Sequence, residues 1–243
     1  MSTSEIEKSE LFYKMTESLV DDKDLSDKKR RSFRGVSAEQ RQAERYQKLM
    51  EAGLQCFGSH GFYKVTVREI CAEAKLTERY FYESFKNTEA LLVAVYQRLI
   101  HGMQQVIISS ILVEENKEPK HLIRLGLTVF LRYVSNDPRI ARILFIDIPH
   151  VRFENKALIM DTMSTFDTML QQFGRILFPN FPEQAVNVDL VTTGLNGANV
   201  HIVMRWVHSN FSYPFEEVLE SCYTLFAAMA EYLENRTDAL HRN

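Results

Sequence analysis

The chain has 243 residues, of which 45% are hydrophobic and 25% are charged, and its net charge is -3. This length allows one large or two small domains, and the apolar content is sufficient for a buried core. There is no charged-then-apolar leader and no apolar run of about 20 residues, so neither secretion nor membrane insertion is indicated and we expect a cytoplasmic protein.

The charge is unevenly distributed along the first third of the chain. Residues 28–86 contain 13 Lys or Arg against 7 Asp or Glu, a balance of +6, whereas residues 1–27 contain 3 against 8, a balance of -5. A concentration of positive charge is what phosphate binding requires. By charge alone, a solvated basic face without a partner is the simpler interpretation.

Residues 1–36 read as an extension with an acidic and a basic part. In the acidic part, Leu11, Phe12, Met15 and Leu19 follow a helical spacing, which indicates either a short amphipathic helix or, as the favoured interpretation, disorder. The basic part, KKRRSFR, precedes the first expected helix and either reaches DNA or is a solvated charge run. Its candidate DNA-binding residues are Lys28, Lys29, Arg30 and Arg31.

Three helix starts follow in close succession. Ser37 with Gln40 forms a capping box that opens a helix ending at residues 58–61, and Thr66 with Glu69 forms another that opens a helix of about nine residues. Thr77 can act as the N-cap of a third helix, residues 77–85. Because such short helices are unstable alone, they must share a core, to which Phe57, Ile70, Leu76, Phe81 and Phe85 are expected to contribute.

The helix at 77–85 exposes polar, aromatic and charged side chains, namely Glu78, Arg79, Tyr80, Tyr82 and Glu83, followed by Lys86. A helix-turn-helix presents such a face to the major groove of DNA, with the start of its second helix toward the base edges. The alternative is a fragment of a helical bundle that happens to have short helices.

This segment resembles the TetR/AcrR family of bacterial transcriptional regulators. The matching residues are Phe57, Gly61-Phe62, Thr66-Val67-Arg68-Glu69-Ile70, Thr77, Tyr82, Phe85-Lys86 and Glu89-Ala90-Leu91-Leu92. One departure is Lys75, where the family usually has Gly; a left-handed turn there would cost a lysine roughly 1 kcal/mol.

The resemblance implies an all-α fold with an N-terminal three-helix, helix-turn-helix DNA-binding domain and a C-terminal helical ligand-binding and dimerisation domain. The expected boundaries are 1–36 for the extension, 37–86 for the DNA-binding domain and 87–243 for the rest. Besides the basic arm, the expected DNA-binding residues are Thr66, Arg68, Thr77, Glu78, Arg79, Tyr80, Tyr82 and Lys86.

After residue 86 the pattern is helical throughout, and no alternating strand pattern survives. Asn87 or Thr88 is expected to cap a long helix that continues toward Ile111, and by the resemblance its first part links the two domains. Breaks that contain Pro or polar residues then separate five candidate helices, at 120–134, 139–148, 155–177, 184–208 and 215–234.

The last two candidate helices resemble the family's dimerisation pair, which forms a four-helix bundle with its copy. The expected interface residues are Gly194, Gly197, Ala198, Met204, Cys222, Phe226 and Met229. The alternative is that this apolar stripe packs within one protomer.

Aromatic residues and methionines are frequent in residues 139–178, where they form either a core or a pocket for apolar ligands. The resemblance favours a pocket for an unidentified, largely apolar small molecule. Its candidate residues are Arg124, Phe145, Ile148, Met163, Phe166, Met169, Phe173 and Asn199.

The sequence contains no GxSxG, HExxH, Walker or GxGxxG motif, so we expect no enzyme and no cofactor. His201 and His208 lie seven residues apart, but no third ligand follows at helical spacing, so we expect no metal site. Cys56, Cys71 and Cys222 have no CxxC spacing and are expected to be small buried hydrophobes, with a redox sensor as the alternative.

Together these features predict a homodimeric, TetR-like transcriptional regulator that binds double-stranded DNA at a pseudo-palindromic operator. In that family a small-molecule ligand most often releases a repressor from its operator. The alternative is a helical ligand-binding or interaction protein without DNA-binding activity.

Overall fold

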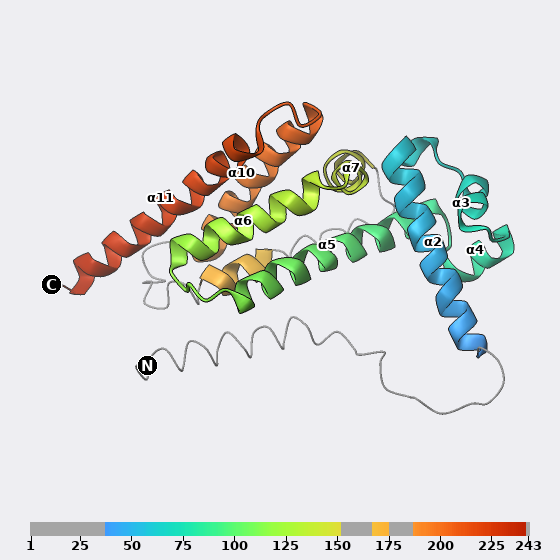
Figure 1. Cartoon of the computed structure of the whole chain (residues 1–243), viewed down its shortest axis with the longest axis horizontal. Helices are drawn as coiled ribbons and strands as arrows, with labels where there is room; N and C mark the ends of the chain where they lie inside the picture. Colours follow the sequence, from blue (N-terminus) through green and yellow to red (C-terminus); the bar gives the residue numbers. More distant parts are fainter. Residues whose placement is uncertain (1–36, 152–166, 175–186, 242–243) are drawn as a thin grey trace. The chain divides into compact units, whose positions relative to one another are not determined.

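The computed structural model describes residues 37–151, 167–174 and 187–241 (Figure 1). Within these ranges every regular element is helical, which confirms the predicted all-α fold. The chain divides into two compact units. The N-terminal unit comprises, of the described residues, 37–101 and 134–151, and the C-terminal unit comprises 102–133, 167–174 and 187–241.

The N-terminal unit begins with α2 (Ala38–His60), whose start is the predicted capping box. The Ser37 hydroxyl accepts a hydrogen bond from the Gln40 N–H at 3.0 Å, and the Gln40 side-chain oxygen accepts one from the Ser37 N–H at 2.9 Å. The helix ends at Gly61, where φ is +86°. Only glycine adopts this backbone conformation without strain, so the chain turns here as the sequence predicts.

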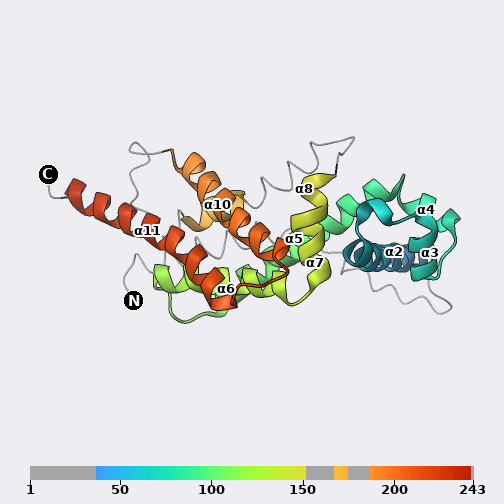
Figure 2. The same ribbon diagram turned by 90° about the horizontal axis from the view of Figure 1, so that it is seen from above.

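A short helical turn, η1 (Phe62–Lys64), leads from α2 to the helix pair α3 (Val67–Ala74) and α4 (Glu78–Ser84). The start of α3 is the predicted capping box, in which Thr66 and Glu69 exchange backbone and side-chain hydrogen bonds. Thr77 occupies the N-cap position of α4, but its hydroxyl accepts no bond from the helix backbone. In both views α3 and α4 lie beside α2 (Figures 1 and 2).

One core joins these helices. Phe57, Ile70 and Phe81 are completely buried, and Phe85 is 7% exposed. The rings of Phe81 and Phe85 lie 5.9 Å apart, and Tyr46 stacks on Phe85 at 5.0 Å. Each short helix is therefore stabilised by its neighbours, as the sequence predicts.

The turn between α3 and α4 places Lys75 in the left-handed conformation, with φ 56° and ψ 42°. Replacing Lys75 by Gly is expected to raise the free energy of unfolding by about 1 kcal/mol, because a Cβ is strained in this region. Chemical denaturation followed by circular dichroism would measure the change. Equal or lower stability of the glycine variant would contradict the expected strain.

A second segment of the N-terminal unit comes from much later in the chain. It comprises α7 (Pro138–Arg142), a π-helical turn η2 (Ile143–Asp147) and α8 (Ile148–His150). Asp137 caps α7 by accepting the Arg139 N–H at 3.0 Å. The sequence-based boundaries assigned this segment to the C-terminal domain, whereas its contacts with α2 group it with the helix-turn-helix.

Two long helices run from one unit into the other. Asn87 caps α5 (Thr88–Val113) by accepting the Ala90 N–H at 2.8 Å, and the division between the units falls after residue 101. In α6 (Pro119–Ser135) the division falls after residue 133. The predicted long helix that leaves the helix-turn-helix is thus confirmed.

The C-terminal unit also contains α10 (Val188–His208), α11 (Phe215–His241) and a helix at residues 167–174. The Arg124 guanidinium joins α6 to α11 through a two-pronged bond to Glu220, at 2.5 and 3.0 Å. Asn210 and Phe211 adopt positive φ between α10 and α11. The Trp206 indole fixes this turn by donating to the Tyr213 carbonyl at 2.9 Å. Among the described residues, no helix is long and apolar enough to cross a membrane.

Candidate nucleic-acid interface

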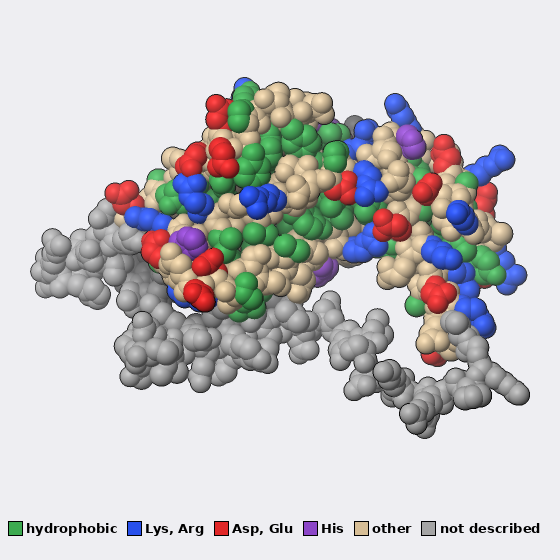
Figure 3. All heavy atoms as spheres, in the orientation of Figure 1, with side chains coloured by type: hydrophobic (Ala, Val, Ile, Leu, Met, Phe, Trp, Pro, Cys, Tyr) green, Lys and Arg blue, Asp and Glu red, His purple; other side chains and the backbone are tan. Residues whose placement is uncertain are grey.

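Helix α4 presents the expected exposed face. Glu78, Arg79, Tyr82 and Lys86 are exposed, and Tyr82 retains 58% of its accessible surface. Tyr80 is less accessible than expected, because the Arg45 guanidinium of α2 lies 4.5 Å from its ring centre. Figure 3 shows Lys and Arg side chains spread over the surface of the helices of this unit.

The start of α3 holds two more of the expected DNA-binding residues. Thr66 and Arg68 are both exposed. The Thr66 hydroxyl is occupied in the capping box, and its hydrogen bond to the carboxylate lowers the pKa of Glu69. Thr77 is exposed at the start of α4, whereas Lys28, Lys29, Arg30 and Arg31 lie outside the described residues. The contacts of all these residues with DNA remain predictions.

Sequence reasoning placed Glu83 on the exposed face and gave it no role. Its carboxylate lies 3.1 Å from the Arg79 Nε, one helical turn earlier, and 4.0 Å from Arg45 of α2. The spacing of four residues between Arg79 and Glu83 was a visible signal for the first pair. The second pair depends on how α2 packs against α4, which no local pattern shows.

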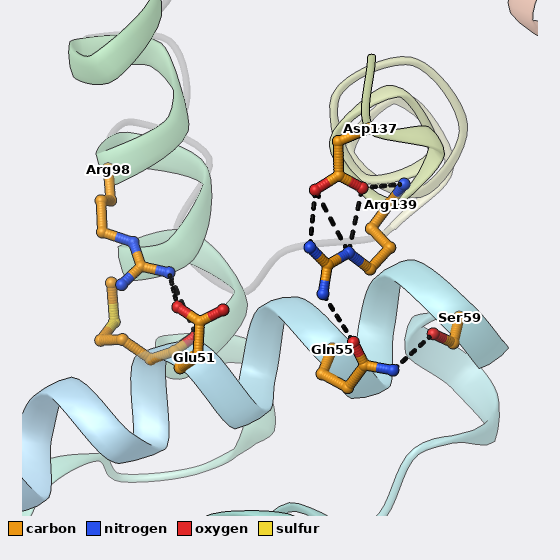
Figure 4. Close-up of polar contacts among 7 residues, drawn as sticks. Glu51, Gln55, Ser59, Arg98, Asp137 and Arg139 are labelled. Atoms are coloured by element: carbon orange, nitrogen blue, oxygen red, sulfur yellow. Dashed lines mark hydrogen bonds and ion pairs between the residues drawn. The ribbon is translucent and has the colours of Figure 1, made fainter. Parts of the chain in front are cut away.

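Behind this face, α7 is attached to α2 by polar contacts and close packing (Figure 4). The Arg139 guanidinium binds the Asp137 carboxylate and donates to the Gln55 side-chain oxygen at 2.6 Å. The backbone of α7 passes so close to Gly58 that an added Cβ would lie 2.7 Å from the Arg139 Cα. Nearer the middle of α2, Glu51 pairs with Arg98 of α5 at 3.4 Å.

The π-helical turn contacts the loop between α2 and α3. The Asp147 carboxylate accepts the Phe62 N–H at 3.3 Å and lies 3.9 Å from Arg142. Burial raises the pKa of Asp147 despite these partners. The Tyr63 hydroxyl donates to the His150 carbonyl at 3.2 Å. Residues 137–150 are therefore anchored to the helix-turn-helix at both ends of the segment.

The residues expected to line a ligand pocket do not all lie in the same unit. Met169, Phe173 and Asn199 are buried in the C-terminal unit, whereas Phe145 and Ile148 are buried in the N-terminal unit. Arg124 is engaged by Glu220 and by the Tyr223 ring, 4.2 Å away, so it is poorly placed to orient a ligand. Met163 and Phe166 lie outside the described residues.

The expected dimer residues also divide into two groups. Gly194, Gly197 and Ala198 are exposed on α10, and a Cβ added to either glycine would have no described residue within 4 Å. Met204, Phe226 and Met229 are partly exposed. Cys222 is completely buried within the single chain, so it packs inside the protomer and not on its surface.

All three cysteines are free and buried, which agrees with the expectation of small buried hydrophobes. Burial raises the pKa of the Cys222 thiol to about 11, so this thiol stays protonated and weakly reactive at neutral pH. The described residues hold no group of three or more His, Cys, Asp or Glu side chains that could bind a metal ion.

Residues 49–95 match the family model described as "Bacterial regulatory proteins, tetR family". These residues include η1, α3 and α4 together with parts of α2 and α5. The fold and this match define the protein as a DNA-binding transcriptional regulator. Over these residues, in its N-terminal unit, the chain carries a helix-turn-helix of the TetR family.

Solved structures show the same fold at low sequence identity. The fatty acid degradation regulator FadR from Bacillus halodurans superimposes with a TM-score of 0.64 at 16% identity, over 79% of this chain and 96% of that one. FadR from Bacillus subtilis in complex with stearoyl-CoA superimposes with a TM-score of 0.64 at 17% identity, over 74% of this chain and 96% of that one. SmeT, the repressor of the Stenotrophomonas maltophilia multidrug efflux pump SmeDEF, superimposes with a TM-score of 0.60 at 16% identity, over 75% of this chain and 89% of that one. No curated protein matches the sequence.

Proposed function

We propose that this regulator is a homodimeric repressor in the bacterial cytoplasm, with no enzymatic activity, and that a small-molecule ligand releases it from its operator. The observation that carries the proposal is the exposed face of α4, built on a fully buried three-helix core and followed by a separate helical unit. One helix-turn-helix buries too little surface for tight specific binding, so two copies reading a pseudo-palindromic site are required.

The C-terminal unit supports a largely apolar ligand. Met169 and Phe173 are buried there, and so are two neutral amides, Gln104 and Asn199. Among the described residues, the buried Gln104 Nε2 and the buried Asn199 Oδ1 have no hydrogen-bond partner. Such atoms are costly to leave unpaired; a carbonyl or hydroxyl oxygen of a ligand would accept from the Gln104 amide, and a ligand hydroxyl would donate to the Asn199 oxygen.

Two of the similar structures suggest which ligands to try first. FadR of Bacillus subtilis was solved with stearoyl-CoA, and SmeT represses a multidrug efflux pump. Stearoyl-CoA, free stearate and a panel of uncharged apolar drugs should therefore be added to the protein–DNA complex in a gel-shift assay. Release of DNA by none of these compounds would remove the support for an apolar effector.

Release requires that the ligand bind one conformation of the protein more tightly than the other. In the described part of the chain, the division between the units is crossed within α5 and within α6. The segment that follows α6 is anchored to α2 and to the Phe62 loop. A movement of either helix would thus act on the helix-turn-helix and change the spacing of the two recognition helices in the dimer.

The DNA-binding part of the proposal is tested at Lys86, which follows α4 and is exposed. Replacing Lys86 by Ala should weaken binding to all DNA sequences and reduce the slope of log K against log salt by about one unit, because one phosphate contact is lost. Fluorescence anisotropy at several salt concentrations gives both quantities. Lys120, partly exposed on α6 in the other unit, provides the control: Lys120→Ala should change neither the affinity nor the slope. If Lys86→Ala leaves affinity and slope intact, α4 does not lie on DNA as proposed.

A further inference from the structure

The acidic residue Glu83 pairs with two arginines, Arg79 of α4 and Arg45 of α2. Its Oε1 lies 3.1 Å from the Arg79 Nε, and its Oε2 lies 4.0 Å from an Arg45 Nη. The same Arg45 guanidinium covers the Tyr80 ring at 4.5 Å. A carboxylate on a surface that approaches phosphates lowers the affinity for DNA by charge repulsion. We therefore expect Glu83 to have a role that offsets this loss.

The geometry of the Arg79 pair indicates that role. Arg79 is 84% exposed, and Glu83 binds it through Nε. A guanidinium has five N–H donors in a fixed fork, and the pair at its outer end, one on each Nη, points away from the carboxylate bound at Nε. Two such donors match the O6 and N7 acceptors of a guanine in the major groove.

We propose that Glu83 is a positioning residue for DNA specificity: it holds Arg79 so that its outer nitrogens read a guanine edge, and its charge disfavours contact with phosphates. The proposal rests on the proposed placement of α4 in the major groove. An arginine fixed in this way has fewer alternative contacts with the phosphate backbone. Glu83 therefore increases the difference between specific and non-specific binding at the expense of total affinity.

The test uses the full-length protein and an operator selected from random duplexes by the wild type. Every base pair of this operator is then changed in turn. Glu83→Gln keeps the shape of the side chain and removes its charge. It is expected to bind random-sequence DNA more tightly than the wild type does and to lose about tenfold in preference at one base pair, within the range for a bidentate contact. Arg79→Ala should lose preference at the same base pair.

Glu73→Gln is the matched control, because Glu73 is exposed on the neighbouring helix α3 and the described part of the chain shows no ion pair for it. This variant should also bind random DNA more tightly, while its base preference stays that of the wild type. In the Arg79→Ala background, Glu83→Gln should cause no further loss of preference, which separates positioning from a general structural effect.

The inference is overturned if Glu83→Gln keeps the wild-type preference at every base pair. It is equally overturned if Arg79→Ala keeps the wild-type preference at every base pair. It is also overturned if Glu73→Gln loses the same preference as Glu83→Gln, since charge alone would then explain the result. Failure of the wild type to select any operator is a different outcome, because it rejects the proposed function itself.

Discussion

Replacing Gly58 by Ala is expected to destabilise the N-terminal unit by about 1–3 kcal/mol, the usual cost of forcing an extra methyl group into a filled contact. An added Cβ would lie 2.3 Å from the Arg139 Cβ and 2.7 Å from its Cα. Since backbone atoms of α7 are involved, a change of side-chain rotamer cannot relieve the clash, and α7 must move away from α2. Thermal unfolding followed by circular dichroism would show the loss.

Gly126→Ala is the matched control for this experiment. Gly126 lies in α6, and its added Cβ would meet Ile111 at 3.6 Å, an ordinary contact distance. Alanine is favoured over glycine in helices, so this variant should be stabilised by up to about 1 kcal/mol. The only tryptophan, Trp206, lies in the C-terminal unit, so its fluorescence reports on that unit separately. Unchanged or increased stability of Gly58→Ala would show that α7 does not press on α2 at this point.

Replacing Ala198 by Glu is expected to split the proposed dimer and to abolish specific operator binding while the helices remain. Ala198 is exposed on α10 next to Gly197, where an added Cβ would meet none of the residues that the structure describes. In a helix-to-helix contact the new carboxylate would be buried without a partner, which costs several kcal/mol. Sedimentation would give the mass of the variant, and circular dichroism its helicity.

Gln105→Glu controls for the added charge, because Gln105 is exposed on α5 and outside the α10 and α11 pair. This variant should keep the mass and the operator affinity of the wild type. A folded Ala198→Glu variant that stays dimeric would mean that the copies associate through another face of the protein.

Local signals explain why so much of the N-terminal unit could be predicted. A capping box involves residues three positions apart, so Ser37 with Gln40 and Thr66 with Glu69 locate two helix starts without knowledge of the fold. The apolar spacing then identified Phe57, Ile70 and Phe81, all completely buried. Thr77 marked the start of α4 correctly, although its hydroxyl does not make the expected bond.

Contacts between distant parts of the chain could not be predicted in this way. Arg124 was expected near a ligand, yet its guanidinium is paired with Glu220, 96 residues later in the chain. Cys222 was expected at an interface, and helix periodicity alone did not reveal which neighbour of α11 would cover it. The approach of α7 to Gly58 likewise depends on tertiary packing between segments about eighty residues apart, a separation over which no local pattern extends.

The anchoring of residues 137–150 to α2 and the Phe62 loop has a consequence for building chimaeric regulators. A hybrid joined at residue 87 would take its helix-turn-helix from one parent and the partners of Gln55 and Phe62 from the other. Arg139 and Asp147 would then meet unmatched surfaces. A hybrid that keeps the operator specificity of one parent and responds to the effector of the other should instead take both 37–101 and 134–151 from the first parent. Only the remaining helices would then come from the second parent.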